Sequence, residues 1–213
     1  MDLNTSIMSF ASSFTALFAI VDPIAVIPIY LSLTDRYSKQ EKLYIGLKAC
    51  LIATLVLCVF AITGEGLFRL FGISMDAFRI AGGILLLMLG IDQLGAHRER
   101  VKTEEENESF AREDISIFPL ATPLLAGPGA ISTVVLQSSQ VSGIGQTILL
   151  LLAIATVFFV SFFFLRSAPH LYRVLGKTGI NLVTRIMGII LTAIAVQFII
   201  DGLKGVVQQM KLH

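Results

Sequence analysis

The stretch FAIVDPIAVIPIY, residues 18–30, places an aspartate and two prolines inside an apolar run that is otherwise long enough to cross a membrane. Proline removes a backbone donor and clashes with the preceding turn, so Pro23 and Pro28 are expected to interrupt a helix here. An acidic residue at the centre of a membrane helix costs ~2.5–3.5 kcal/mol on insertion scales. Asp22 and the prolines therefore predict a membrane helix that is broken for a functional reason.

The composition is that of an integral membrane protein. Hydrophobic residues make up 55% of the 213 residues, charged residues make up 15%, and the mean hydropathy is +0.82. A spanning helix needs ~20 mostly apolar residues, and six such runs use almost the whole chain. We therefore expect an all-α membrane protein with six transmembrane helices. The runs cover roughly residues 7–33, 43–66, 73–94, 115–137, 146–165 and 182–203.

The distribution of Lys and Arg predicts the orientation. Twelve of these residues lie in or beside the odd-numbered loops, and four lie beside the even-numbered loops or the C-terminus. Because cytoplasmic loops carry the excess of Lys and Arg, both termini are expected on the outside, in the periplasm. The first run lacks the features of a cleaved signal and is expected to be retained. A net charge of +1 without a basic stripe argues against nucleic acid as a partner.

The two halves of the chain resemble each other. DPIAVIP at 22–28 matches TPLLAGP at 122–128, RIAGGIL at 79–85 matches RIMGIIL at 185–191, and two shorter matches fall between them in the same order. A unit of three spans ends on the opposite side from its start, so a second copy must be inverted, as in many secondary transporters. The expected organisation is a first three-helix repeat over 1–95, a charged cytoplasmic loop over 96–114 and an inverted three-helix repeat over 115–213.

The paired prolines predict where a ligand binds. We expect helices 1 and 4 to be unwound over 22–28 and 122–128 at mid-membrane, with new helices starting after Pro28 and Pro128. Such backbone survives at that depth only inside the protein or against a polar cavity. Free N–H groups at the new helix starts suit a carboxylate and the carbonyls of the preceding ends suit an ammonium, so an amino acid would match both. The glycines of AGPGA favour a small one.

These motifs carry a resemblance to a known family. DPIAVIPIYLSLT (22–34) and PLLAGPGAI (123–131) are similar to the paired motifs of the MarC family of bacterial inner-membrane proteins, which includes SnatA-type transporters of small neutral amino acids. The likeness covers essentially the whole chain, although residues 24–26 depart from the Phe-Gly-Asn that is common there. The resemblance implies export of glycine or alanine by alternating access, with a coupling proton or sodium ion left open. No cofactor is expected.

The expected substrate-binding residues lie on the two breaks and on two threonines that flank them. Thr54 and Thr156 match in the repeat and lie near mid-span, and the alternative is that each hydroxyl bonds back to its own helix. Gln137 and Gln197 are weaker candidates. The expected set is Asp22, Pro23, Ala25, Val26, Pro28, Thr122, Pro123, Ala126, Gly127, Pro128, Gly129, Thr54 and Thr156.

Three roles for Asp22 remain open on the sequence alone. The carboxylate can cap the freed N–H groups, hold the ammonium of a substrate, or carry a proton. Its counterpart in the repeat, Thr122, can cap but cannot hold charge. Capping is therefore the role that both halves are expected to share.

Enzyme activity is not expected. Asp92 and Asp201 end different spans at opposite faces, so they form no aspartyl dyad and are interpreted as interfacial groups. The histidines show no metal-ligand spacing on a helix, and the chain has no P-loop for ATP. Cys50 and Cys58 are separated by about 12 Å along one helix and are interpreted as packing residues.

Two other classes of function are left open. A polar cavity between broken helices could form a channel for small polar solutes or ions. A scaffold of tightly packed helices would use the small residues at 64, 66, 82 and 83 as close-contact positions. The scaffold interpretation leaves the aspartate inside the first span unexplained.

Overall fold

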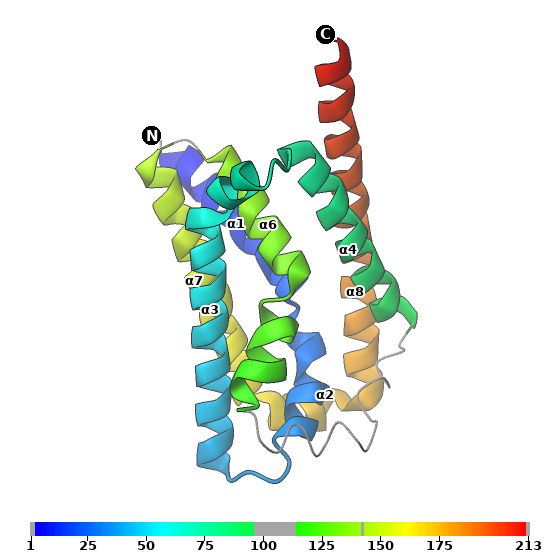
Figure 1. Cartoon of the computed structure of the whole chain (residues 1–213). Coiled ribbons are helices and arrows are strands. Elements are labelled where there is room, and N and C mark those ends of the chain that lie inside the picture. Colours follow the sequence, from blue (N-terminus) through cyan, green and yellow to red (C-terminus); the bar gives the residue numbers. More distant parts are fainter. Residues whose placement is uncertain (1–2, 96–113, 142, 212–213) are drawn as a thin grey trace.

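A computed structural model describes residues 3–95, 114–141 and 143–211, which form helices and connecting turns (Figure 1). The expected loop 96–114 lies outside the described residues except for Asp114. The helices are α1 (Leu3–Val21), α2 (Pro23–Leu33), α3 (Lys39–Leu70), α4 (Met75–Gly95), η2 (Ser116–Leu125), α6 (Pro128–Gln140), α7 (Ile144–Arg166) and α8 (Ala168–Lys211).

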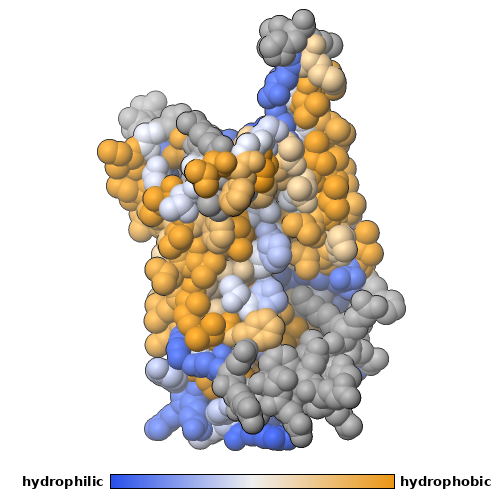
Figure 2. Space-filling model, in the orientation of Figure 1, coloured by the Kyte–Doolittle hydropathy of each residue, from blue (hydrophilic) through white to orange (hydrophobic). Residues whose placement is uncertain are grey.

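The prediction of an all-helical, multi-pass membrane protein is confirmed. Five segments are long and apolar enough to span a membrane, and η2 with α6, bent by 58°, makes a sixth if the pair counts as one span. Apolar side chains cover the flanks of the molecule, whereas hydrophilic ones gather toward its two ends (Figure 2). The element α8 starts at Ala168, earlier than the expected last span, but a kink at Gly176 (φ 62°, ψ 179°) divides it into a short first helix and the long helix that follows.

Both termini lie at one end of the molecule, and the turns between α2 and α3 and between α7 and α8 lie at the other (Figure 1). The best-buried side chains include Leu17, Ile27, Phe158 and Leu165, contributed by α1, α2 and α7. The Tyr30 hydroxyl donates a hydrogen bond of 2.7 Å to the carbonyl of Lys42, which ties the end of α2 to the start of α3.

The helices α4 and α8 form a tightly packed pair beside the other spans (Figure 1). Small residues allow this approach, since a Cβ on Gly83 would lie 2.8 Å from the carbonyl oxygen of Ala195, and one on Gly202 would lie 2.8 Å from that of Asp76. The pair reaches the other helices mainly where α8 contacts α2 and α4 contacts α6.

Three of the four glycines singled out for packing do lie at close contacts. A Cβ would lie 2.6 Å from Val135 at Gly64, 3.0 Å from Ser132 at Gly82 and 2.7 Å from Ile199 at Gly83. Gly66 differs, because no atom of the described residues lies within 4 Å of its Cβ position.

Candidate functional site

The first break is one residue long. The helix α1 ends at Val21, α2 begins at Pro23, and Asp22 between them has left-handed backbone angles (φ 43°, ψ 65°) and is 2% exposed. Aspartate is one of the few residues other than glycine that adopts this conformation, and proline is favoured at the first position of a helix. One carboxylate oxygen, Oδ1, accepts a hydrogen bond of 3.2 Å from the backbone N–H of Ala25. Asp22 therefore caps α2, which is one of its three expected roles.

The expectation that residues 22–28 are unwound is wrong beyond Asp22. The helix α2 runs without interruption from Pro23 to Leu33, with Pro28 inside it. The left-handed angles of Asp22 already interrupt the helix, and Pro23 fixes the φ of the first residue of α2. The new helix start therefore follows Asp22 and does not follow Pro28.

The second break is wider and irregular. Phe118 (φ −125°, ψ 127°) and Thr122 (φ −131°, ψ 125°) are extended within η2, and each precedes a proline, which disfavours helical geometry at the preceding residue. The chain leaves η2 through Ala126 and enters α6 through Gly127 (φ −77°, ψ 173°), and Pro128 is the first residue of α6. A helix thus begins at Pro128, close to where it was expected.

The expectation that Thr122 caps the new helix is wrong. Its hydroxyl donates a 3.3 Å hydrogen bond to the carbonyl of Ile117, back into η2. The N-cap of α6 is Gly127, which offers no side chain for a capping hydrogen bond. Thr122 is five residues too early because the extended turn is added before α6 starts, so capping is not a role that both halves share.

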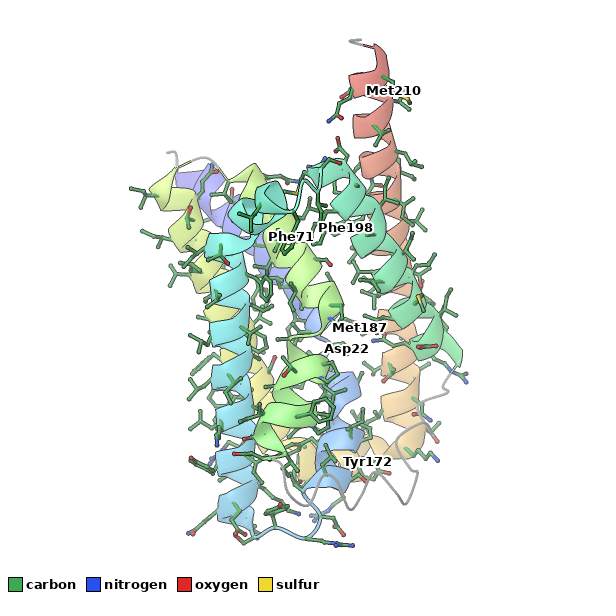
Figure 3. The ribbon with its side chains drawn as sticks, in the orientation of Figure 1. Asp22, Phe71, Tyr172, Met187, Phe198 and Met210 are labelled. Carbon is green, nitrogen blue, oxygen red and sulfur yellow. The ribbon has the colours of Figure 1, made fainter. Side chains whose placement is uncertain are left out.

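The two glycines of the second motif have packing partners. A Cβ on Gly127 would collide with the carbonyl oxygen of Pro123. A Cβ on Gly129 would lie 2.6 Å from Cδ2 of Leu86 on α4 and 3.5 Å from Cγ2 of Ile20 on α1. Gly129 therefore marks a point where the start of α6 and the end of α1 approach each other. Asp22, which follows α1, lies about half-way along the bundle (Figure 3).

The structure brings part of the expected set together and separates the rest. Pro23, Ala25, Val26, Ala126 and Gly129 are buried around the breaks, Pro28, Thr122 and Gly127 are half-buried, and Pro123 and Pro128 are exposed. The hydroxyls of Thr54 and Thr156 donate to the carbonyls of Cys50 (2.8 Å) and Leu152 (2.7 Å), so each bonds back to its own helix.

A large cavity lies between the breaks and the end of the molecule that carries the termini. Its volume is about 970 Å³, and α1, α4, α6, α7 and α8 contribute to its wall. Most of its polar residues were missed by the sequence reasoning, although Gln137 and Gln197 were weaker candidates. The signal was present as polar residues inside apolar spans, for example serines with helical spacing. Its polar lining consists of Ser9, Ser12, Ser13, Arg79, Gln137, Gln140, Gln146, Gln197, Asp201, Lys204 and Gln208.

Comparison with known proteins assigns the family. The model of the MarC family of integral membrane proteins matches residues 7–207. The chain belongs to the MarC family. The MarC relatives include a UPF0056 membrane protein of Methanocaldococcus jannaschii, 39% identical over 206 residues (96% of this chain and 98% of the relative). They also include YhcE of Escherichia coli, 37% identical (91% of each chain), and YvbG of Bacillus subtilis, 39% identical (90% and 92%). No solved structure matches this MarC chain.

Proposed function

We propose that this MarC protein is a secondary transporter that exports small neutral amino acids, such as glycine or alanine, by alternating access. The substrate binds between the two breaks in spans 1 and 4. The observation that carries the proposal is the pair of helix starts at Pro23 and Pro128. Their proximity is supported by Gly129, next to Pro128, because a Cβ there would lie 3.5 Å from Ile20 near the end of α1. Helix starts attract a carboxylate, and helix ends together with the buried Asp22 attract an ammonium.

The packing of the helices supports an inverted repeat. Two helices of the first half contact helices of the second half, α2 with α8 and α1 with α7. In the repeat, α1, α2, α3 and α4 correspond to η2, α6, α7 and α8. The equivalent contacts are therefore α6 with α4 and η2 with α3, and both pairs are in contact. The two helix starts, Pro23 and Pro128, then correspond with an offset of 105 residues, so Gly127 and not Thr122 takes the place of Asp22.

The protein is proposed to lie in the inner membrane of a bacterium with both termini in the periplasm. The support is the excess of Lys and Arg at the loops opposite the termini. In this orientation the 970 Å³ cavity lies on the periplasmic side of the breaks. Fusions of alkaline phosphatase to the C-terminus test this orientation, since the enzyme folds actively only in the periplasm.

Proteoliposomes loaded with unlabelled amino acid test the transport function. Uptake of labelled glycine, alanine, serine and leucine is measured with and without proton and sodium gradients. We expect saturable uptake of glycine and alanine that is stimulated by amino acid on the opposite side, and little uptake of leucine. Uptake without trans-stimulation would indicate a channel, and absence of uptake under every gradient would contradict the proposal.

A further inference from the structure

The outward cavity has a largely polar lining. Five glutamines and three serines provide groups that both donate and accept hydrogen bonds, and they lie beside two cations and one carboxylate. Such a wall offers partners to a small polar molecule. None of the residues at the two breaks belongs to this lining, so the cavity is distinct from the binding site proposed above.

Arg79 is the cation best placed to bind an anionic group. It lies on α4, its side chain is only 23% exposed although it lines the cavity, and Gly202 of α8 allows it to pack closely. Its Nη1 lies 3.3 Å from Oδ1 of Asp76, and Asp76 also accepts a 3.1 Å hydrogen bond from Gln209. Because a guanidinium carries five N–H donors in a planar fork, the contact with Asp76 leaves donors for a carboxylate.

Asp201 places the opposite charge on the neighbouring helix. Its Oδ1 accepts a 2.9 Å hydrogen bond from Gln197 and lies 3.8 Å from Nζ of Lys204. The side chain is 44% exposed, and the residue directly precedes Gly202, on which Arg79 packs. Arg79 and Asp201 thus both line one cavity, and each also has a partner of opposite charge on its own helix, Asp76 for Arg79 and Lys204 for Asp201.

A second acceptor faces the cavity from α6. Gln137 contributes to the wall, and its buried Oε1 has no hydrogen-bond partner among the described residues. A buried acceptor without a donor costs ~1–3 kcal/mol, so a donor brought by a ligand would relieve that cost after a small rotation of the amide.

We propose that the outward cavity is a second binding site for a small zwitterionic amino acid, with its carboxylate on Arg79 and its ammonium on Asp201. The inference rests on the proposed transport function, for which it supplies an outer site that a substrate occupies between the breaks and the exterior. Charge-assisted hydrogen bonds to Arg79 fix the carboxylate end of the ligand.

Equilibrium binding of labelled alanine to the protein in lipid nanodiscs tests this site. For the wild type we expect two classes of bound alanine, one central and one in the cavity. Arg79→Gln is expected to weaken the cavity class by about tenfold or more and to leave the central class unchanged. Arg79→Lys, which keeps the charge but loses the fork, should restore part of the affinity.

Ligand analogues separate recognition from a merely structural effect. Alaninamide, which lacks the carboxylate, should compete poorly for the cavity class of the wild type, and propionate, which lacks the ammonium, should be insensitive to Asp201→Asn. The matched control is Arg185→Gln, which removes the repeat counterpart of Arg79 and lies outside the cavity. This variant should leave both classes intact.

The outcomes distinguish the two proposals. A single class of alanine that is unaffected in a folded Arg79→Gln protein would overturn the cavity site and leave the central site standing. An equal loss of alanine and alaninamide in that variant would also overturn it, because carboxylate recognition would not be involved. If the wild type binds no amino acid, the proposed function fails together with this inference.

Discussion

The two breaks begin from similar sequences and reach different structures. At the first, DPIAVIP folds with one left-handed residue, Asp22, whose carboxylate caps the next helix. At the second, TPLLAGP contains the extended Thr122, a further turn and an uncapped helix start at Gly127. Threonine is β-branched and disfavours the left-handed region that aspartate tolerates. The chain therefore cannot turn at residue 122 as it turns at residue 22.

The two breaks share a backbone requirement but differ in the side chain before the new helix. Both halves need a proline at the first position of the new helix, at Pro23 and at Pro128. The first half meets its backbone requirement with an acid, and the second half meets it with glycine. A charged side chain at a helix start is thus present in one half only, which gives the two breaks unequal roles toward a zwitterion.

The largest expected effect comes from adding a side chain to the second break. Gly127→Ala should destabilise the protein by about 3 kcal/mol, because the new Cβ collides with the backbone carbonyl of Pro123, which has no rotamer to change. The measurement is the apparent melting temperature in detergent by far-UV circular dichroism. Gly66→Ala is the matched control, since its Cβ position has no neighbour within 4 Å in the part of the chain that the structure describes. Equal stability of the two variants would show that the second break is not tightly packed.

This packing limits what the sequence could predict. The six spans, the interruption at Asp22 and the helix start near Pro128 follow from apolar runs and proline chemistry, which are local properties. The continuous α2 and the displaced Thr122 do not, because they depend on which of two prolines begins a helix. The polar wall of the cavity was also hidden, since Arg79 and Asp201 are 122 residues apart and meet only through the packing of α4 on α8.

The next largest effect is expected at Asp22, where two variants separate its capping role from its charge. Asp22→Ala loses both the cap and the tolerance of left-handed angles, at a cost of about 2 kcal/mol in the free energy of unfolding. Asp22→Asn keeps both, so its melting temperature should stay close to that of the wild type while alanine transport is strongly impaired. Near-normal transport by Asp22→Asn would restrict Asp22 to capping.

Removal of Pro28 is expected to raise the stability of the protein, whereas the variants above lower it. Inside α2 this proline cannot donate to the carbonyl four residues earlier, so Pro28→Ala should stabilise the protein by about 1 kcal/mol. Pro128→Ala should change stability less, because the N–H at the first position of a helix has no partner within the helix. Thermal unfolding of both variants provides the measurement. A loss of stability in Pro28→Ala would mean that α2 depends on the shape of the proline ring.

The smallest effect concerns how the irregular second half is held at its start, where Asp114 precedes η2. Its carboxylate pairs with Lys48 and accepts a 3.0 Å hydrogen bond from the N–H of Ser116, and its carbonyl accepts bonds from Ile117 and Phe118. The Lys48 hydrogen bond and then those of Ser116 lower the pKa of this exposed carboxyl to about 2. A lowered folded-state pKa stabilises the protein above the unfolded pKa of about 4, and this contribution is lost as the pH falls through 2. The difference in melting temperature between wild type and Asp114→Asn should therefore be constant above about pH 5 and shrink toward about pH 2. Added salt should also decrease this difference, because exposed ion pairs are screened. A pH-independent difference would place the support of η2 in its packing and not in the ion pair of Asp114 with Lys48.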